Sequence, residues 1–320
     1  MRTIVTAAGL ASDVQEFLRF KRAMGLVYGR AEFTLGGFVR FVAQHWGEDG
    51  AVALDEAVLR WTTRIAGRKA LTVASDFGIV RQLCLFRRRR DPGGYVPEHA
   101  IAPVKESVFL PCIFTHAQVR QLLAAATGYE GRSMSGGMLR ALVLVLYCTG
   151  LRLGEAVRLH TTDVDLAHAV LTVQHSKGRS RIVPIRADLV EELQHYDSER
   201  QRLPGKTETM PFFLRRNGSA LTVKTASNVL RGLLRELGMK PPRGRIGARP
   251  YELRHSFAVH RLTAWALEGA DVHARLPWLS AYLGHQNVLG TEVYLKATPE
   301  LLELASARFE AHLHRKRRPR

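Results

Sequence analysis

The sequence predicts two domains: an all-α domain at the N-terminus and a mainly α domain with a small antiparallel β-sheet at the C-terminus. Apolar residues recur at helical spacing through the first 95 residues, and the proline-rich stretch 91–111 then interrupts that period. Helical spacing returns in the second half, except at 169–185, where β-branched runs flank a short polar turn. A chain of 320 residues is long enough for two cores of ordinary size.

The N-terminal domain is expected to span residues 1–95 as a bundle of four helices. Ser12 or Asp13 is the expected N-cap of the first helix, because both side chains can accept a hydrogen bond from a free backbone N–H. The last helix ends in four consecutive arginines, which either stabilise its own C-terminal carbonyls or contact the phosphates of a nucleic acid. These arginines are Arg87, Arg88, Arg89 and Arg90, and the four helical segments are 12–26, 31–46, 54–67 and 71–90.

A linker at 96–111 is expected to lead into a second domain at 112–310, followed by a basic tail at 311–320. Thr115 is the expected N-cap of the first helix of that domain, and Gly150 follows the buried helical run before it as the expected C-terminal glycine. The segment 169–185 predicts a β-hairpin with Ser-Lys-Gly-Arg at its turn. Further helices are predicted at 187–202, 222–238, 251–268, 278–284 and 299–314.

The charge of the chain indicates a polyanionic partner. Lys and Arg number 47 against 29 Asp and Glu, a formal net charge of +18. Such a field attracts polyanions, so the expected partner is nucleic acid, with an anionic membrane or ribosomal RNA as alternatives that composition does not separate. The apolar run at 141–148 is too short to span a bilayer, and the N-terminus lacks the apolar core of a signal peptide. The three cysteines, Cys84, Cys112 and Cys148, are scattered without metal-ligand spacing, so we expect a reducing cytoplasm and no metal site.

Four separated motifs carry the candidate chemistry: "TGLRLGE", "SKGRSRIVP", "ELRHSFAVH" and "LGHQN", the last followed by a tyrosine. Each alone has an ordinary explanation: a surface ion pair, a solvated turn lysine, the polar face of a helix, a tyrosine in a core. Their order and spacing together resemble the tyrosine recombinase (phage integrase) family over the whole chain. The residues concerned are Arg152, Glu155, Lys177, Arg254, His285 and Tyr294.

The resemblance implies an N-terminal SAM-like core-binding domain and a catalytic domain with the DNA breaking-rejoining fold. It implies that Tyr294 attacks a DNA phosphate and forms a 3′-phosphotyrosyl link, while Arg152 and Arg254 hold the phosphate oxygens. Lys177 would protonate the leaving 5′ oxygen, His285 would donate a hydrogen bond to the phosphate, and Glu155 would orient Arg152. The link conserves bond energy, so the implied enzyme needs no ATP, metal or other cofactor.

One departure from the family pattern concerns the residue three positions before the second arginine. The family usually has histidine there, sometimes lysine, and this chain has Tyr251. A phenol is a poor base at neutral pH but can donate a hydrogen bond, so we hypothesise that Tyr251 contacts the phosphate. Tyr294 would then lose its proton to water or to another group. His255 is the nearest substitute, although its spacing favours a packing role.

A second departure is the long segment between Arg254 and His285, which resembles transposon-encoded relatives. The resemblance therefore implies integration, excision or transposition of a mobile element in the bacterial cytoplasm, in association with the nucleoid. The implied partner is a double-stranded DNA recombination site, contacted by the Arg87–Arg90 run and by Arg179 and Arg181 of the hairpin. A tetramer would act on two synapsed sites, alone or with related recombinases, and the amphipathic segment 298–313 would dock in its own chain or a neighbour's.

Two alternatives remain open from the sequence. A type IB topoisomerase uses the same kinds of residues, and would relax supercoiled DNA without a specific site. A catalytically impaired DNA-binding member would bind without forming a covalent product, and Tyr251 in place of the usual histidine would be the first sign of lost catalysis.

Overall fold

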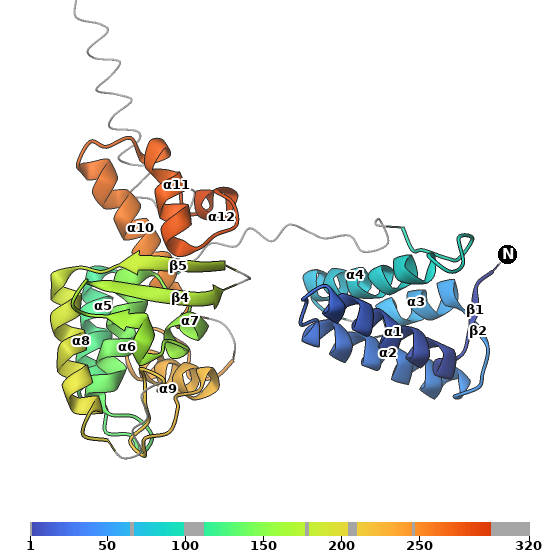
Figure 1. Ribbon diagram of the computed structural model, residues 1–320, viewed down its shortest axis with the longest axis horizontal. Coiled ribbons are helices and arrows are strands. Elements are labelled where there is room, and N and C mark those ends of the chain that lie inside the picture. The colour runs from blue at the N-terminus through green and yellow to red at the C-terminus, as the bar shows by residue number, and fades with distance from the viewer. Residues whose placement is uncertain are drawn as a thin grey trace, which may run out of the picture. The chain divides into compact units, whose positions relative to one another are not determined.

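The computed structural model describes residues 2–64, 67–98, 112–176, 179–203, 210–244 and 247–295, with backbone only at 175, 176 and 179. The chain forms two compact units whose division falls between Val108 and Phe109, in the undescribed segment 99–111 (Figure 1). The predicted linker 96–111 lies mostly outside the described residues, and the predicted domain boundaries stay predictions. Lys177, the segment 298–313 and the basic tail also lie outside the described residues.

The first unit contains the four predicted helices, α1 Ala7–Ala23, α2 Gly29–Trp46, α3 Leu54–Thr63 and α4 Ala70–Arg87. Their apolar faces meet around Leu10, Phe38 and Val80, all fully buried. A two-stranded antiparallel ribbon, β1 Ile4–Val5 with β2 Val52–Ala53, joins the start of the chain to the start of α3 and was not predicted.

The first helix begins earlier than predicted. Thr6, and not Ser12 or Asp13, is its N-cap: the Thr6 hydroxyl accepts a hydrogen bond from the Gly9 N–H at 3.1 Å. Leu10 is buried on the same face as Val14, so the apolar stripe also extends toward the N-terminus. Asp13 lies inside the helix and pairs with Arg87 of α4 at 2.9 Å.

The second unit is mainly helical around a small sheet, as predicted. Its described elements are α5 His116–Thr127, α6 Gly136–Thr149, α7 Leu153–Val157, a 3-10 turn at Thr161–Asp163, β3 Val164–Asp165, β4 Val170–Ser176, β5 Arg179–Pro184, α8 Ala187–Arg200, α9 Val223–Glu236, α10 Glu252–Leu267, α11 Val272–Leu283 and α12 Leu289–Glu292. The sheet order is β3-β4-β5, antiparallel throughout, so the predicted hairpin has an additional short edge strand. Thr115 caps α5 in a capping box with Gln118, as expected.

Two parts of this unit bring distant segments together. Helix α6 packs against α5, α8 and α10 through an almost entirely buried surface, and α11 contacts both α10 and β5 (Figure 1). Helix α11 begins six residues before the predicted start at 278, because the Asp271 carboxylate caps the Ala274 N–H and the helix continues through Pro277. Its C-terminal end at Leu283 is thereby carried to the junction of α6 and α7, as the contacts below show.

Candidate active site

Gly150 makes a tight junction between α6 and α7. Its φ of +64° is a left-handed conformation that favours glycine, and a Cβ there would lie 2.6 Å from Phe257 and 2.7 Å from Leu283. The chain can therefore turn sharply and present Arg152 as the N-cap residue of α7.

Glu155 is the buried carboxylate of the site. Its side chain is 1% exposed, and it accepts hydrogen bonds from the Arg152 backbone N–H at 3.0 Å and from Arg152 Nη1 at 2.6 Å. Arg181 Nη2 of β5 donates to the same carboxylate at 2.9 Å. A buried carboxylate requires such pairing, because the desolvation of an ion is costly unless opposite charge and hydrogen bonds compensate it. Glu155 thus fixes two guanidinium groups at once.

Arg254 is a buried cation held by carbonyl oxygens. It is 1% exposed, and its Nη1 and Nη2 donate to the carbonyls of Gly150 at 2.7 Å and Leu283 at 2.8 Å. Burial, followed by the positive charge of Arg152, lowers the pKa of Arg254. Guanidinium nevertheless stays protonated in proteins, so the site retains a concentrated positive charge that favours an oxyanion ligand.

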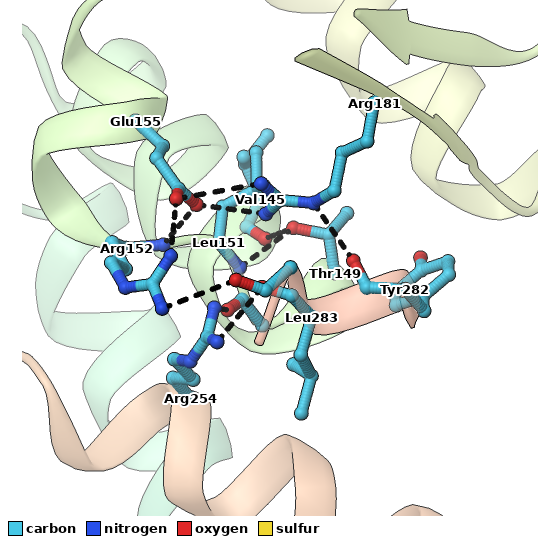
Figure 2. A network of polar contacts seen from close by, with 11 residues as sticks. Val145, Thr149, Leu151, Arg152, Glu155, Arg181, Arg254, Tyr282 and Leu283 are labelled. Atoms are coloured by element: carbon cyan, nitrogen blue, oxygen red, sulfur yellow. Dashed lines mark hydrogen bonds and ion pairs between the residues drawn. The ribbon is translucent and has the colours of Figure 1, made fainter. Parts of the chain in front are cut away.

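The C-terminal end of α11 gathers three guanidinium groups from three different elements (Figure 2). Arg181 Nε donates to the Tyr282 carbonyl at 3.0 Å, Arg254 to Leu283, and Arg152 Nη2 to Gly284 at 3.5 Å. These are consecutive carbonyls at a helix end, where the last C=O groups have no partner within the helix and the helix dipole favours cations. Three distant stretches of sequence are therefore fixed against one helix terminus.

His285 follows directly after this terminus. Its Nδ1 lies 2.7 Å from the Thr291 hydroxyl, and its ring stacks at 6.3 Å from the Tyr294 ring. Gly284, with φ +70°, allows the turn between α11 and His285, and its ideal Cβ position is 2.6 Å from Arg181 Nη1.

Tyr294 is 1% exposed and packs with Leu262, Leu279 and Leu283. Tyr294 is therefore a core residue, which was the alternative to a catalytic role. Its hydroxyl nevertheless lies 3.1 Å from His255 Nδ1. Burial raises the pKa of Tyr294, while the positive charge of Arg254 opposes that shift. The one side chain thus combines core packing with a polar environment at its hydroxyl.

The structure brings most of the predicted site residues together. Arg152, Glu155, Arg254, His285 and Tyr294 meet as described, and Tyr251 is 39% exposed with its ring 4.7 Å from that of His255. Lys177, at the hairpin turn, lies outside the described residues. Arg179 begins β5, and its side chain is not described.

Of the arginines predicted to contact DNA, the five whose side chains are described have partners within the protein. Arg181 binds Glu155 and the Tyr282 carbonyl inside the site. In the first unit, Arg87 and Arg90 pair with Asp13, Arg88 Nε donates to the Pro92 carbonyl, and Arg89 lies over the Phe20 ring at 4.4 Å.

The sequence indicated His255 as the nearest substitute but favoured a packing role for it, and it placed Arg181 on DNA. The contact of His255 with Tyr294 and the burial of Arg181 against Glu155 were missed. A signal for Arg181 was present: strand alternation puts it on the same face as Val183, which is fully buried, whereas Ile182 between them is exposed. For His255 the helical period predicts a buried face but not which side chain it meets. Its contact with Tyr294 joins segments 39 residues apart.

In chemical terms this is an oxyanion site beside a phenol. Three guanidinium groups can stabilise negative charge on a tetrahedral or pentacoordinate centre, and the phenolic oxygen can act as a nucleophile once it is deprotonated. Among the described residues there is no group of three or more His, Cys, Asp or Glu side chains suited to a metal ion.

Comparisons with known proteins agree with this chemistry. The sequence profile described as the phage integrase family matches residues 113–300. The y4rB protein of Sinorhizobium fredii, an integrase/recombinase by name, is 30% identical over 303 residues, covering 93% of this chain and 96% of that protein.

Two solved structures share the fold. XerH recombinase bound to palindromic difH substrate has a TM-score of 0.66 at 18% identity, covering 95% of this chain and 97% of that one. The Tn1549 transposon integrase in complex with transposon right end DNA has a TM-score of 0.65 at 18% identity, covering 96% and 100%. The predicted fold class is thereby confirmed. The chain belongs to the phage integrase family and is a site-specific tyrosine recombinase, an enzyme that cleaves and rejoins DNA.

Proposed function

We propose that Tyr294 is the nucleophile of this recombinase, that Arg152 and Arg254 bind the phosphate, and that Arg181 positions them through Glu155 and the end of α11. The observation that carries the proposal is the convergence of these three guanidinium groups on the consecutive carbonyls 282–284, directly before His285. The positive charge of Arg254 also acts on the Tyr294 hydroxyl.

The proposed reaction is an in-line exchange of phosphate esters. Arg152 and Arg254 hold the non-bridging oxygens and gain strength as negative charge accumulates. The Tyr294 oxygen bonds to phosphorus, the bond to the 5′ oxygen breaks, and Lys177 protonates the departing oxygen. His285 donates a hydrogen bond to the phosphate, as does Tyr251 in place of the family's usual histidine. A 5′-hydroxyl from another strand then reverses these steps and reseals the DNA.

Substrate access requires a local change of structure, because Tyr294 is 1% exposed. Tyr294 follows the short helix α12, which has four residues. The side chains of Leu289 within α12 and of Val293 after it are exposed. We propose that DNA binding displaces α12 enough for the phosphate to reach the hydroxyl.

The biological setting that we propose is a mobile element of bacteria, acting in the cytoplasm at the nucleoid. The proposal of transposition is supported by the structural likeness to the Tn1549 transposon integrase, whose structure with transposon DNA covers 96% of this chain. Within the described residues, every helix is too short or too polar to span a bilayer.

We further propose a tetramer on two synapsed DNA sites, alone or with related recombinases. An apolar groove of about 290 Å³ lies between α10, α11 and the end of β5, with Phe257, Trp265 and Trp278 among its lining residues. Trp278 is an exposed large hydrophobic side chain. The amphipathic segment 298–313, which lies outside the described residues, is the proposed occupant, donated by a neighbouring subunit.

The experiment that tests this proposal is covalent trapping on nicked DNA from the flanks of the gene. Loss of a short fragment beyond the nick makes cleavage irreversible, so the wild-type protein accumulates as a covalent complex. Tyr294→Phe should form none, and Tyr251→Phe should form it more slowly. Binding without any covalent complex in the wild type supports the impaired alternative, and relaxation of unrelated supercoiled plasmids supports the topoisomerase.

A further inference from the structure

We propose that His255 is a catalytic residue, the base that accepts the phenolic proton of Tyr294, with Glu252 positioning its ring. This inference rests on the proposed role of Tyr294 as the nucleophile. It names the group that takes over the proton in a site where Tyr251 replaces the family's usual histidine.

The geometry of His255 carries the inference. Its Nδ1 lies 3.1 Å from the Tyr294 hydroxyl, within the reach that a general base requires, and the two rings meet edge to face at 5.4 Å. Tyr251, by contrast, reaches His255 with its ring and is partly exposed. The ring of His285 stacks on that of Tyr294 at a centroid distance of 6.3 Å.

Glu252 lies one helical turn before His255 on α10. It is buried, its Oε2 lies 3.7 Å from His255 Nε2, and its Oε1 accepts a hydrogen bond from Arg249 Nε at 2.9 Å. A neutral imidazole carries one N–H. At 3.7 Å Glu252 lies beyond hydrogen-bond distance, so it acts on the ring through its negative charge, which favours the tautomer with the proton on Nε2. Nδ1 is then left with a lone pair directed at the Tyr294 hydroxyl.

The charge state of His255 suits this task at neutral pH. Burial, followed by the positive charges of Arg254 and Arg249, lowers its pKa to about 4. The ring is therefore neutral above that pH and has a lone pair for the proton, but with this pKa it is a weak base in the free protein. The groups that face it are Tyr251, Glu252, Arg249, Arg254 and Tyr294. A bound phosphodiester would offset the charge of Arg254, so the basicity of His255 rises when DNA is present.

The proton balance of the step is complete. The proton leaves the Tyr294 oxygen for His255 Nδ1 as the oxygen bonds to phosphorus, and the bond to the 5′ oxygen breaks. The 5′ oxygen takes a different proton, from Lys177. In rejoining, Tyr294 leaves as a phenolate and recovers its proton from His255.

A test that separates this role from packing is His255→Asn, which keeps an acceptor near the position of Nδ1 but cannot take the proton. We expect cleavage to be about 100-fold slower. The rate should then rise with pH toward the pKa of Tyr294, whereas the wild-type rate is nearly constant from pH 6 to about 9. The matched control is His260→Asn on the same helix, whose Nδ1 lies 2.8 Å from the Tyr147 hydroxyl, and it should cleave normally.

A change of the leaving group separates the role of His255 as the base from that of Lys177 as the acid. A substrate with sulfur in place of the 5′ bridging oxygen departs without protonation, so it should rescue Lys177→Ala and leave His255→Asn slow. An unchanged rate and pH profile in His255→Asn overturns the inference. Restoration of the His255→Asn rate by the sulfur-substituted DNA overturns it as well. Tyr294→Phe in the same assay separates the two ideas: if it still forms the covalent complex, the proposed function itself fails.

A measurement on the intact protein covers the case in which His255→Asn does not fold. Nitrogen-15 spectra of labelled histidine, assigned by comparison with Tyr294→Phe, report which ring nitrogen of His255 carries the proton. The inference expects a neutral ring protonated at Nε2 between pH 6 and 8. A proton on Nδ1 would contradict it, because Nδ1 could then only donate to Tyr294.

Discussion

Two groups of arginines gather at two helix ends in this protein, and they arise in opposite ways. At the end of α4 the arginines are consecutive in the sequence, and Arg87 and Arg90 share the carboxylate of Asp13. At the end of α11 they come from α7, β5 and α10, and Arg152 and Arg181 share Glu155. Both arrangements match cations to the negative end of a helix dipole.

The two acidic residues differ in burial, and burial decides what each arrangement can do. The Asp13 side chain is 19% exposed and that of Glu155 is 1% exposed. Water screens the first group, so its ion pairs contribute little energy and its arginines can change partner. The second group is held in a low-dielectric environment, where charge acts more strongly on a reacting phosphate. Clustering in the sequence is therefore a weaker indication of catalysis than convergence in space.

The largest expected effect is at the buried arginine. Arg254→Lys keeps the charge but loses the planar fork that bonds Gly150 and Leu283 and that we propose also holds the phosphate. We expect cleavage of nicked DNA to fall about 100- to 1,000-fold, with DNA binding nearly intact. Arg87→Lys is the matched control and should cleave at the wild-type rate.

The comparison of the two carboxylates predicts a difference in stability. Glu155→Gln leaves Arg152 and Arg181 without their shared charge partner, so we expect the free energy of unfolding to fall by about 3 kcal/mol. Asp13→Asn, at the more exposed pair, should cost less than about 1 kcal/mol. Urea denaturation of both variants measures the difference. Equal losses would show that burial does not distinguish the two groups.

A smaller effect is expected at the arginine on the sheet. Arg181→Lys keeps one bond to Glu155 but cannot also reach the Tyr282 carbonyl in the same geometry. Because Arg181 acts through Glu155 and the end of α11, we expect cleavage to slow about 10-fold. The single-turnover rate on nicked DNA measures it, and a loss as large as that of Arg254→Lys would place Arg181 directly on the phosphate.

The smallest expected effect is at the exposed arginine run. If Arg88 and Arg89 contact DNA phosphates, each change to alanine should lower the salt dependence of binding by about 0.9 per lost contact. The cleavage rate at saturating protein should not change. Titrations of labelled DNA at several salt concentrations measure the slope, and an unchanged slope would assign the run to the stabilisation of α4 alone.

Much of the fold and site could be predicted because its signals are local. Neighbouring residues alone indicate the helical spacing, the Thr115 capping box and the helix end at Gly150. The order of the motifs around Arg152, Arg254 and Tyr294 was enough to indicate the family. The helix start at Thr6 was missed because Ser12 and Asp13 are equally good caps by residue type, and only tertiary packing selects between them.

The rest depends on contacts between distant segments. The carbonyls 282–284 have no side-chain signal, so a sequence cannot indicate that three arginines meet there. The early start of α11 was obscured by Pro277, which usually interrupts a helix. The contact between His255 and Tyr294 depends on how α10 packs against the segment after α12.

The most direct test of the central claim is to identify the amino acid that carries the DNA. Wild-type protein trapped on nicked DNA is digested with protease and nuclease, and mass spectrometry locates the residual nucleotide. The account predicts a 3′-phosphate ester on Tyr294, which accumulates much more slowly in Arg254→Lys. A nucleotide on Tyr251 or on any other residue would contradict it.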